Sequence, residues 1–253
     1  MKYNAFITAG GLISGKFAQM TGTEIKALIK IDGKSLLQRA VYALRESGVI
    51  SRIALVAPEE MRGTPEVRGV DDFIPADKSG VENILRGLRN FKDDKHVVLC
   101  TSDLPFINAN AVKDFIERCP EDAAVCYPIF ERDEINPSIR PGVPSYIKLR
   151  DGHFTGGSIF RLDTAVCLLG IDEIGKSFRK RKSALGMASL LGWRFVLELL
   201  LGRAKLESLI KRAGEIIGGK CVAVRGCDPV ITMDIDDEKS YLFSLELSKS
   251  RQI

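Results

Sequence analysis

The stretch Ala5-Phe6-Ile7-Thr8-Ala9-Gly10-Gly11 is a short apolar run that ends in two adjacent glycines. Such a run predicts a buried strand, and glycines at its end let backbone N–H groups approach a phosphate because no Cβ blocks them. Lys16 and Lys26 follow and could neutralise phosphate oxygens. A plain turn is the commoner outcome for two such glycines, and neither the G-x-x-x-x-G-K-[ST] nor the G-x-G-x-x-G pattern is present.

Apolar runs and helical stripes alternate through the first half of the chain. The expected strands are Ala5–Thr8, Ile53–Val56, Phe73–Ile74, Val97–Cys100 and Ala123–Tyr127, and the expected helices lie at 37–44, 81–88 and 109–118. Apolar residues recur at i, i+3, i+4 and i+7 in the first two of these helices, which is the spacing of a helix that packs on a core. Strands that alternate with helices favour right-handed crossovers. We therefore predict an α/β fold, with a Rossmann-like, mostly parallel sheet flanked by helices.

The pattern changes after Pro128. Three prolines make 131–145 a loop, and residues 162–217 are predicted to be mostly helical. Strands are expected at 146–149, 222–224 and 231–233, a hairpin turn at Asp151-Gly152, and a closing helix at 237–248. We treat residues 1–253 as one domain with a helical insertion at about 162–217.

Composition narrows the functional classes. A net charge of +4 over 253 residues is compatible with anionic substrates but too weak to indicate nucleic-acid binding. The six cysteines form no C-x-x-C pair, and two histidines accompany them, so a zinc site is not expected. Met1-Lys2-Tyr3-Asn4 leads into a strand without a signal-peptide apolar region. Together with the apolar surroundings of several cysteines, this predicts a cytoplasmic protein.

The stretch 185–201 is strongly apolar, but Arg194 and Glu198 interrupt it. It lacks the roughly 18 uninterrupted apolar residues of a membrane span, so stable membrane insertion is not expected. A helix buried in the monomer is the favoured interpretation. A homodimer interface and a peripheral membrane contact are the alternatives.

Two acidic positions could hold a metal. Asp103 follows the fullest apolar strand, although an aspartate there can also be a helix cap or turn residue. Strand alternation would place Asp234 and Asp236 on one face, and Asp237 is a natural cap for the closing helix. Mg²⁺ usually takes one or two carboxylates plus substrate phosphates, an arrangement that Asp103 and Asp236 would suit.

These segments together resemble a known family, the MobA-like NTP transferases, which are nucleotidyltransferases of the GT-A type. The similar segments are Thr8–Gly11, Lys26–Leu28 with Ile31–Leu37, Gly80–Leu88, Ser102–Pro105, Thr155–Ser158 and Asp234–Tyr241. They occur in the family's order and span residues 5–241.

The resemblance implies a role for each segment. Ala9, Gly10 and Gly11 would bind the triphosphate, and Gly80 and Asn83 the base or ribose. Lys26, with Lys16, would be catalytic. Asp103, Asp236 and Asp234 are the candidate Mg²⁺ ligands. Gly156, Gly157, Ser158 and Lys182 would lie on the acceptor side. The implied reaction moves an NMP from an NTP to a phosphorylated small molecule, such as a sugar phosphate or a pterin cofactor, and releases pyrophosphate.

The chain also departs from the family pattern. Lys16 stands near the position where the family usually has a loop arginine, and Ser158 replaces the family's asparagine. The closing segment Asp234–Tyr241 lacks the family's proline. The run Arg179–Lys182 is either an acceptor-binding segment or a solvated helix face. A GT-A glycosyltransferase and a non-catalytic nucleotide-binding module are the alternative functions. The sequence names neither the base nor the acceptor.

Overall fold

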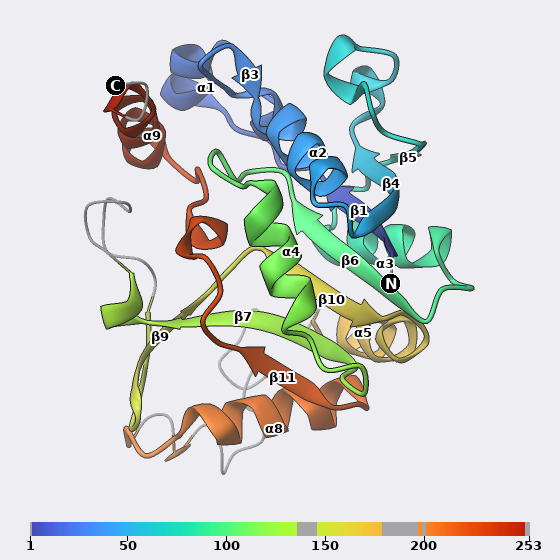
Figure 1. Ribbon diagram of the computed structural model, residues 1–253, viewed down its shortest axis with the longest axis vertical. Coiled ribbons are helices and arrows are strands. Elements are labelled where there is room, and N and C mark those ends of the chain that lie inside the picture. The colour runs from blue at the N-terminus through green and yellow to red at the C-terminus, as the bar shows by residue number, and fades with distance from the viewer. Residues whose placement is uncertain (1, 136–145, 179–196, 199–200, 251–253) are drawn as a thin grey trace.

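A nine-stranded mixed sheet forms the centre of the protein (Figure 1). The computed structural model describes residues 2–135, 146–178, 197–198 and 201–250. The strand order is β5-β4-β1-β6-β10-β7-β9-β8, with β11 beside β7. The strands are β1 (Tyr3–Thr8), β4 (Ile50–Ala57), β5 (Asp72–Pro75), β6 (His96–Thr101), β7 (Val125–Glu131), β8 (Ile147–Leu149), β9 (Gly152–Gly156), β10 (Ile159–Asp163) and β11 (Cys221–Val224). Pairs that include β9 or β10 are antiparallel, and the others are parallel.

Helices cover both faces of this sheet. The helices are α1 (Gly15–Thr21), α2 (Leu36–Glu46), α3 (Gly80–Asn90), α4 (Ala109–Glu117), α5 (Thr164–Phe178), α8 (Leu206–Ile217) and α9 (Glu238–Ser250). Helices α2 and α4 pack together on one face, and α3 and α5 on the other (Figure 1). The small hairpin β2 (Lys30–Ile31) and β3 (Lys34–Ser35) lies beside α9.

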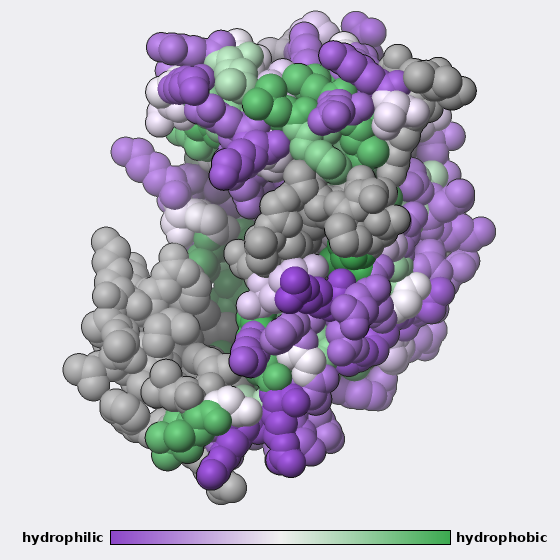
Figure 2. All heavy atoms as spheres, turned by 90° about the vertical axis from the view of Figure 1, so that its left-hand side faces the viewer, coloured by the Kyte–Doolittle hydropathy of each residue, from purple (hydrophilic) through white to green (hydrophobic). Residues whose placement is uncertain are grey.

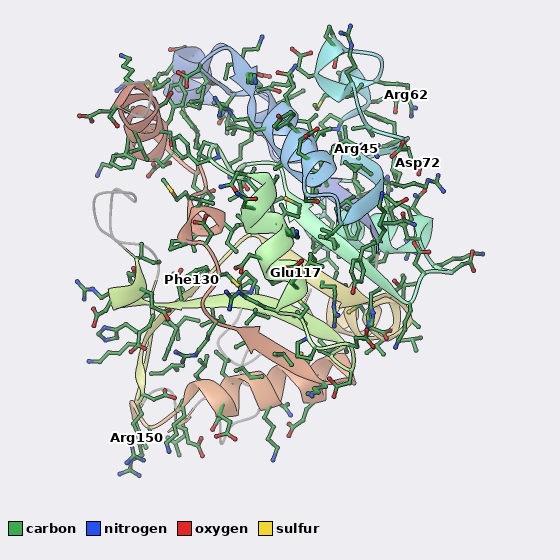
Figure 3. All side chains as sticks on the ribbon, viewed as in Figure 1. Arg45, Arg62, Asp72, Glu117, Phe130 and Arg150 are labelled. Carbon is green, nitrogen blue, oxygen red and sulfur yellow. The ribbon has the colours of Figure 1, made fainter. Side chains whose placement is uncertain are left out.

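The apolar runs are explained by this two-sided burial. On β1, Ala5 and Ile7 join the core under α2 and α4, whereas Phe6 points into the core under α3 and α5. Because successive side chains point to opposite faces, a strand covered on both faces must be apolar at nearly every position. Phe130 is buried on β7, whereas Arg62 and Arg150 lie on the outside (Figure 3).

Local signals set where helices begin and end. The Ser35 hydroxyl accepts a hydrogen bond from the Gln38 backbone N–H at 3.1 Å, and the Gln38 side chain accepts one from the Ser35 N–H at 2.9 Å. This capping box starts α2. Gly48, with a φ of 71°, follows the end of the helix in the left-handed region. Asp237 accepts from the Ser240 N–H at 2.8 Å, which confirms its predicted capping of α9.

The predicted α/β fold of the GT-A type is confirmed, and so are the strands and helices expected between residues 5 and 128. One expected strand is wrong, because Ile231 and Thr232 belong to a 3₁₀ helix, Pro229–Thr232, that Asp228 caps. Proline at its first position fixes a helical φ and removes a donor that a strand would need. The short helix α1, in the segment between Gly11 and Lys26, was not expected. Arg179–Lys182 and most of 185–201 lie outside the described residues.

No helix in the described part of the chain is long and apolar enough to cross a lipid bilayer.

Candidate functional site

Three charged side chains meet at the ends of β1 and β6. The Lys26 ammonium lies 2.7 Å from an Asp103 carboxylate oxygen and 2.5 Å from an Asp236 oxygen. The side chains of Lys26 and Asp103 are 16% and 18% exposed, whereas that of Asp236 is 68% exposed. One ammonium therefore bridges a largely buried carboxylate and one that faces solvent.

Backbone hydrogen bonds bring the three residues together from distant parts of the chain. The Lys26 N–H donates to the Gly11 carbonyl at 3.0 Å, which ties the lysine to the end of the first strand. The Ile235 N–H donates to the Asp103 carbonyl at 3.1 Å, which brings Asp236 next to the segment after β6. The Lys26 side chain starts from a 3₁₀ helix, Lys26–Leu28, rather than from an extended segment.

The lysine stays protonated because of its partners. Burial disfavours the ammonium and is the largest single influence, but Asp103 and then Asp236 together outweigh it, so the pKa of Lys26 is raised above its ordinary value. The side chain therefore carries a positive charge at neutral pH. It can pair with a phosphate oxygen as readily as with a carboxylate.

Thr101 is a site residue that the sequence argument missed. Its hydroxyl donates to Asp103 at 2.5 Å, and its N–H donates to the Ser158 carbonyl at 3.0 Å. Thr101 therefore holds the Asp103 carboxylate and connects it to the segment 156–158. The available signal was spacing, because Thr101 stands two positions before Asp103 at the end of a strand.

The end of β1 approaches the start of α3. A Cβ built on Gly10 would lie 2.7 Å from the Asn83 side-chain nitrogen, so a larger residue would push Asn83 away. Asn83 is 5% exposed. Its side-chain oxygen accepts a hydrogen bond from the Asp77 N–H at 2.6 Å, and its side-chain nitrogen donates to the Asp77 carbonyl at 3.0 Å. Asn83 thus shapes the loop before Gly80 and lies directly against Gly10. Gly80 opens α3, and an added Cβ there would meet open space.

The loop between Gly11 and Lys26 closes on itself. Leu12 and Ile25 form an isolated bridge, and the Ile13 N–H donates to the Glu24 carbonyl at 2.8 Å. Helix α1 at the tip contains no buried residue. Lys16 lies on this helix, 78% exposed and 3.3 Å from Glu238 of α9, so it does not join the Lys26 group in this structure.

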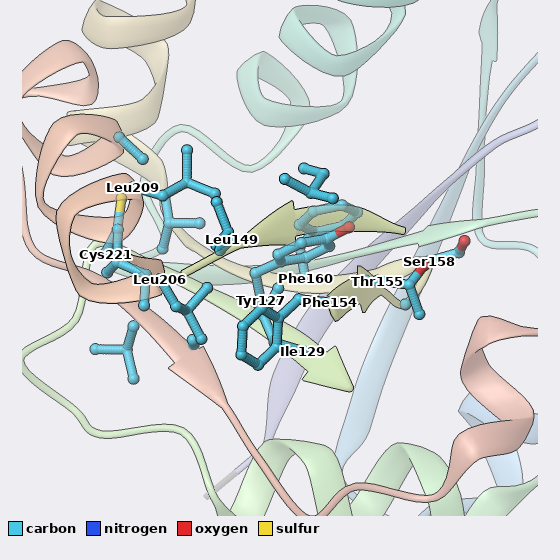
Figure 4. A pocket seen from close by; sticks show the side chains of 18 of the residues that line it. Tyr127, Ile129, Leu149, Phe154, Thr155, Ser158, Phe160, Leu206, Leu209 and Cys221 are labelled. Carbon is cyan, nitrogen blue, oxygen red and sulfur yellow. The ribbon is translucent and has the colours of Figure 1, made fainter. Parts of the chain in front are cut away.

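The acceptor-side candidates Gly156, Gly157 and Ser158 line a cavity of about 570 Å³ (Figure 4). Gly156 is required by packing, because an added Cβ would overlap the Tyr127 hydroxyl at 1.6 Å. Asp234 and Asp236 also line this cavity, which therefore adjoins the Lys26 group. The segment after Thr232 is not a strand, so the expected strand alternation does not explain the common placement of the two aspartates. Lys182 lies outside the described residues.

Two carboxylates converge here rather than a larger cluster. Within the described ranges, no group of three or more His, Cys, Asp or Glu side chains could hold a metal ion. Asp103 and Asp236 each approach the same nitrogen within 2.7 Å, so a cation near that point could bind both. Mg²⁺ commonly uses one or two carboxylates and completes its shell with phosphate oxygens and water. The pair therefore fits that ion.

Known structures share this fold. A structure from Thermus thermophilus described as a hypothetical transferase is 28% identical, with a TM-score of 0.78, and the match covers 95% of this chain and 100% of that one. A 2-C-methyl-D-erythritol 4-phosphate cytidylyltransferase, also from Thermus thermophilus, is 12% identical, with a TM-score of 0.56, over 98% and 100% of the two chains. At that identity the likeness shows the fold alone.

Sequence comparison identifies the family. A protein of Methanocaldococcus jannaschii named as a putative HTH-type transcriptional regulatory protein is 30% identical over 116 residues, which are 46% of this chain and 30% of that protein. This chain thus spans under a third of that relative's length. The family model for the MobA-like NTP transferase domain matches residues 5–156, which include Gly10, Lys26 and Asp103. The chain belongs to the MobA-like NTP transferase domain family.

Proposed function

We propose that this protein transfers a nucleoside monophosphate from an NTP to a phosphorylated small molecule and releases pyrophosphate. The observation that carries the proposal is the convergence of Lys26, Asp103 and Asp236 beside the two glycines that follow β1. Family membership supports the reaction type. The acceptor class is our own assignment.

The chain's residues would act mainly by positioning and charge. The backbone N–H groups of Ala9, Gly10 and Gly11 would hold the triphosphate. Gly11 lies next to Lys26, because a Cβ built on Gly11 would stand 3.6 Å from the Lys26 Cβ and Cδ atoms, so the same phosphates would be within reach of the lysine. The Lys26 ammonium would pair with an α-phosphate oxygen, where negative charge increases as the new bond forms. Lys16 would approach the outer phosphates from α1.

Asp103 and Asp236 would hold Mg²⁺, which supplies charge neutralisation on the phosphate oxygens when it is bound. Thr101 keeps Asp103 oriented through its hydroxyl. Asp236 is exposed enough to leave Lys26 when a nucleotide enters, which would free the ammonium for phosphate. Asp234, on the wall of the same cavity, is the alternative ligand.

The acceptor would enter from the cavity beside Gly156, Gly157 and Ser158, opposite the nucleotide side at Gly80 and Asn83. Its phosphate would attack the α-phosphorus in line with the departing pyrophosphate. We place the enzyme in the cytoplasm, because its six cysteines are free thiols and five of them are buried, as is usual in a reducing compartment.

The test is pyrophosphate release by the purified protein with Mg²⁺, each of the four NTPs and a panel of phosphorylated acceptors. Release with one NTP, dependent on an acceptor, supports the proposal. Binding of an NTP without transfer to any acceptor fits the non-catalytic module instead. Turnover of a nucleotide sugar, with release of the nucleoside diphosphate, would indicate a glycosyltransferase.

A further inference from the structure

The cavity next to Asp236 has an apolar wall formed by one helix. Leu206, Leu209, Ile210 and Ala213 follow each other on α8 at i, i+3, i+4 and i+7, and all four line the cavity (Figure 4). Part of this stripe is core, because Leu206 is buried with Leu149 and Phe154, and Leu209 and Ile210 pack half-buried against them. Here the stripe borders a space of about 570 Å³, which is within the range of small-molecule sites.

The facing wall is aromatic. The rings of Tyr127 and Phe160 are stacked, with centroids 4.9 Å apart and planes at 9°. Phe154 on β9 lies beside them (Figure 4). Figure 2 shows hydrophobic atoms inside a hollow of this face of the molecule. The described residues on both walls of the cavity are therefore largely apolar.

The charged side chains among the described lining residues lie at one end of the cavity. Asp234 and Asp236 line it, and Asp236 contacts the Lys26 ammonium. Among the described residues that line it, there is no lysine, arginine or histidine. The described walls offer the hydroxyl groups of Tyr127, Thr155 and Ser158 and are otherwise largely apolar. The body of a sugar phosphate would therefore leave several of its own hydroxyl groups without hydrogen-bond partners, which is unfavourable. An apolar body would instead gain from leaving water.

We propose that the acceptor is a phosphate monoester of an apolar alcohol. Its phosphate lies at the Asp236 end and its body extends between α8 and the Tyr127–Phe160 pair. This rests on the proposed function. An acceptor phosphate oxygen forms the bond to the α-phosphorus, the bond from that phosphorus to the bridging oxygen breaks, and pyrophosphate leaves with the electron pair. The product is a pyrophosphate diester of the nucleoside and the alcohol.

Binding is tested first, without nucleotide. Hexyl, octyl and decyl phosphate and geranyl phosphate are titrated by calorimetry below their micelle concentrations, beside 1-naphthyl phosphate and glucose 1-phosphate. Affinity should rise about fourfold for each added methylene until the cavity is filled, on the scale of one buried methylene. If the alkyl phosphates bind more tightly than 1-naphthyl phosphate, the alcohol of the acceptor is linear. If 1-naphthyl phosphate binds more tightly, the alcohol contains a ring. Equal affinity for decyl and glucose phosphates overturns the proposal.

Ala213→Glu puts a carboxylate into the cavity, and Ser208→Glu adds the same charge to the same helix at a residue that does not line it. The first should raise the KM of the apolar acceptor at least tenfold and leave the KM of the NTP within twofold, and the second should change neither. Thermal unfolding checks that both variants fold. If Ala213→Glu folds and leaves the acceptor KM unchanged, the cavity is not the acceptor site. If no NTP binds to the wild type, the proposed function fails. The calorimetry still tests whether the cavity binds apolar phosphate monoesters.

Discussion

Lys26 is held by charge rather than by apolar packing at its end, since its nitrogen contacts Asp103 and Asp236. A positive group in that place can stabilise the charge that develops on the α-phosphate. We expect Lys26→Met to lower kcat by about 10²-fold or more, the usual cost of losing one electrostatic stabiliser. Lys26→Met should still fold, because Asp103 keeps its hydrogen bond from Thr101, but it should lose some stability because the largely buried Asp103 carboxylate loses its charged partner.

The matched control is Lys30→Met, because Lys30 lies four positions on and forms a longer, exposed ion pair with Glu66 at 3.7 Å. Steady-state pyrophosphate release measures both variants. A Lys26→Met enzyme with kcat within a few-fold of the wild type would remove Lys26 from the catalytic group.

The same lysine makes stability depend on pH in the alkaline range. Its folded-state pKa is raised, because Asp103 and Asp236 outweigh the opposing effect of burial. Its contribution is therefore complete below the ordinary lysine pKa of about 10.4 and is lost as the pH rises through the higher folded-state pKa. Urea unfolding at pH 7 to 11.5 should give a constant difference in unfolding free energy between the wild type and Lys26→Met up to about pH 9.5. Above about pH 10.4, the difference should shift against the wild type. A difference that is flat to about pH 11.5 would contradict the ion-pair assignment.

At the scale of elements, α3 depends on one glycine to approach the sheet. A Cβ built on Gly87 would lie 2.2 Å from the Phe6 ring of β1, which is fully buried. Gly87→Ala should therefore lower the unfolding free energy by about 1–3 kcal/mol, the range for an overpacked core. Gly80→Ala on the same helix is the control, because its Cβ meets open space, and it should be neutral or stabilising by up to about 1 kcal/mol.

Denaturant unfolding of the two glycine variants measures the difference. Equal stability would mean that α3 can move away from β1 without cost, and the close packing of Phe6 against this helix would then not hold the nucleotide side of the site in place.

At the scale of the whole molecule, the site joins segments from near both ends of the chain. A ligand that bridges Lys26, Asp103 and Asp236 should stabilise the complete fold. At about 100 times its Kd, an NTP with Mg²⁺ should add about 2.7 kcal/mol, which corresponds to roughly 5–10 °C in Tm for a chain of this length. Asp103→Asn should lose most of this shift. Asp93→Asn, an exposed residue before β6 at the opposite end of that strand, should keep it.

Differential scanning fluorimetry with the NTP, Mg²⁺ and both together gives the measurement. A full shift by NTP in the presence of EDTA, or an unchanged shift in Asp103→Asn, would show that the carboxylates do not hold a cation with the nucleotide.

The order of the elements could be predicted because each signal is local. An apolar run such as Val97–Cys100 marks a strand buried on both faces, and the capping residue Ser35 and Gly48 bound a helix by their own backbone chemistry. Order and handedness then restrict the sheet to few arrangements. The strand expected at 231–233 is wrong for a related reason, because the proline at 229 acts locally and outweighs an apolar run of three residues.

The candidate site could be predicted in part. The sequence by itself determined which residues were available for the site, because the motifs that contain them can be identified from their spacing along the chain. These residues are Gly10, Lys26, Asp103 and Asp236. Only the tertiary structure decided that Lys26 bridges both carboxylates, that Thr101 orients Asp103, and that Tyr127 and Phe160 face the stripe on α8. These contacts join residues up to 210 positions apart. No local pattern encodes such pairs, because they form only when the packing of the whole sheet fixes the distance between its strand ends.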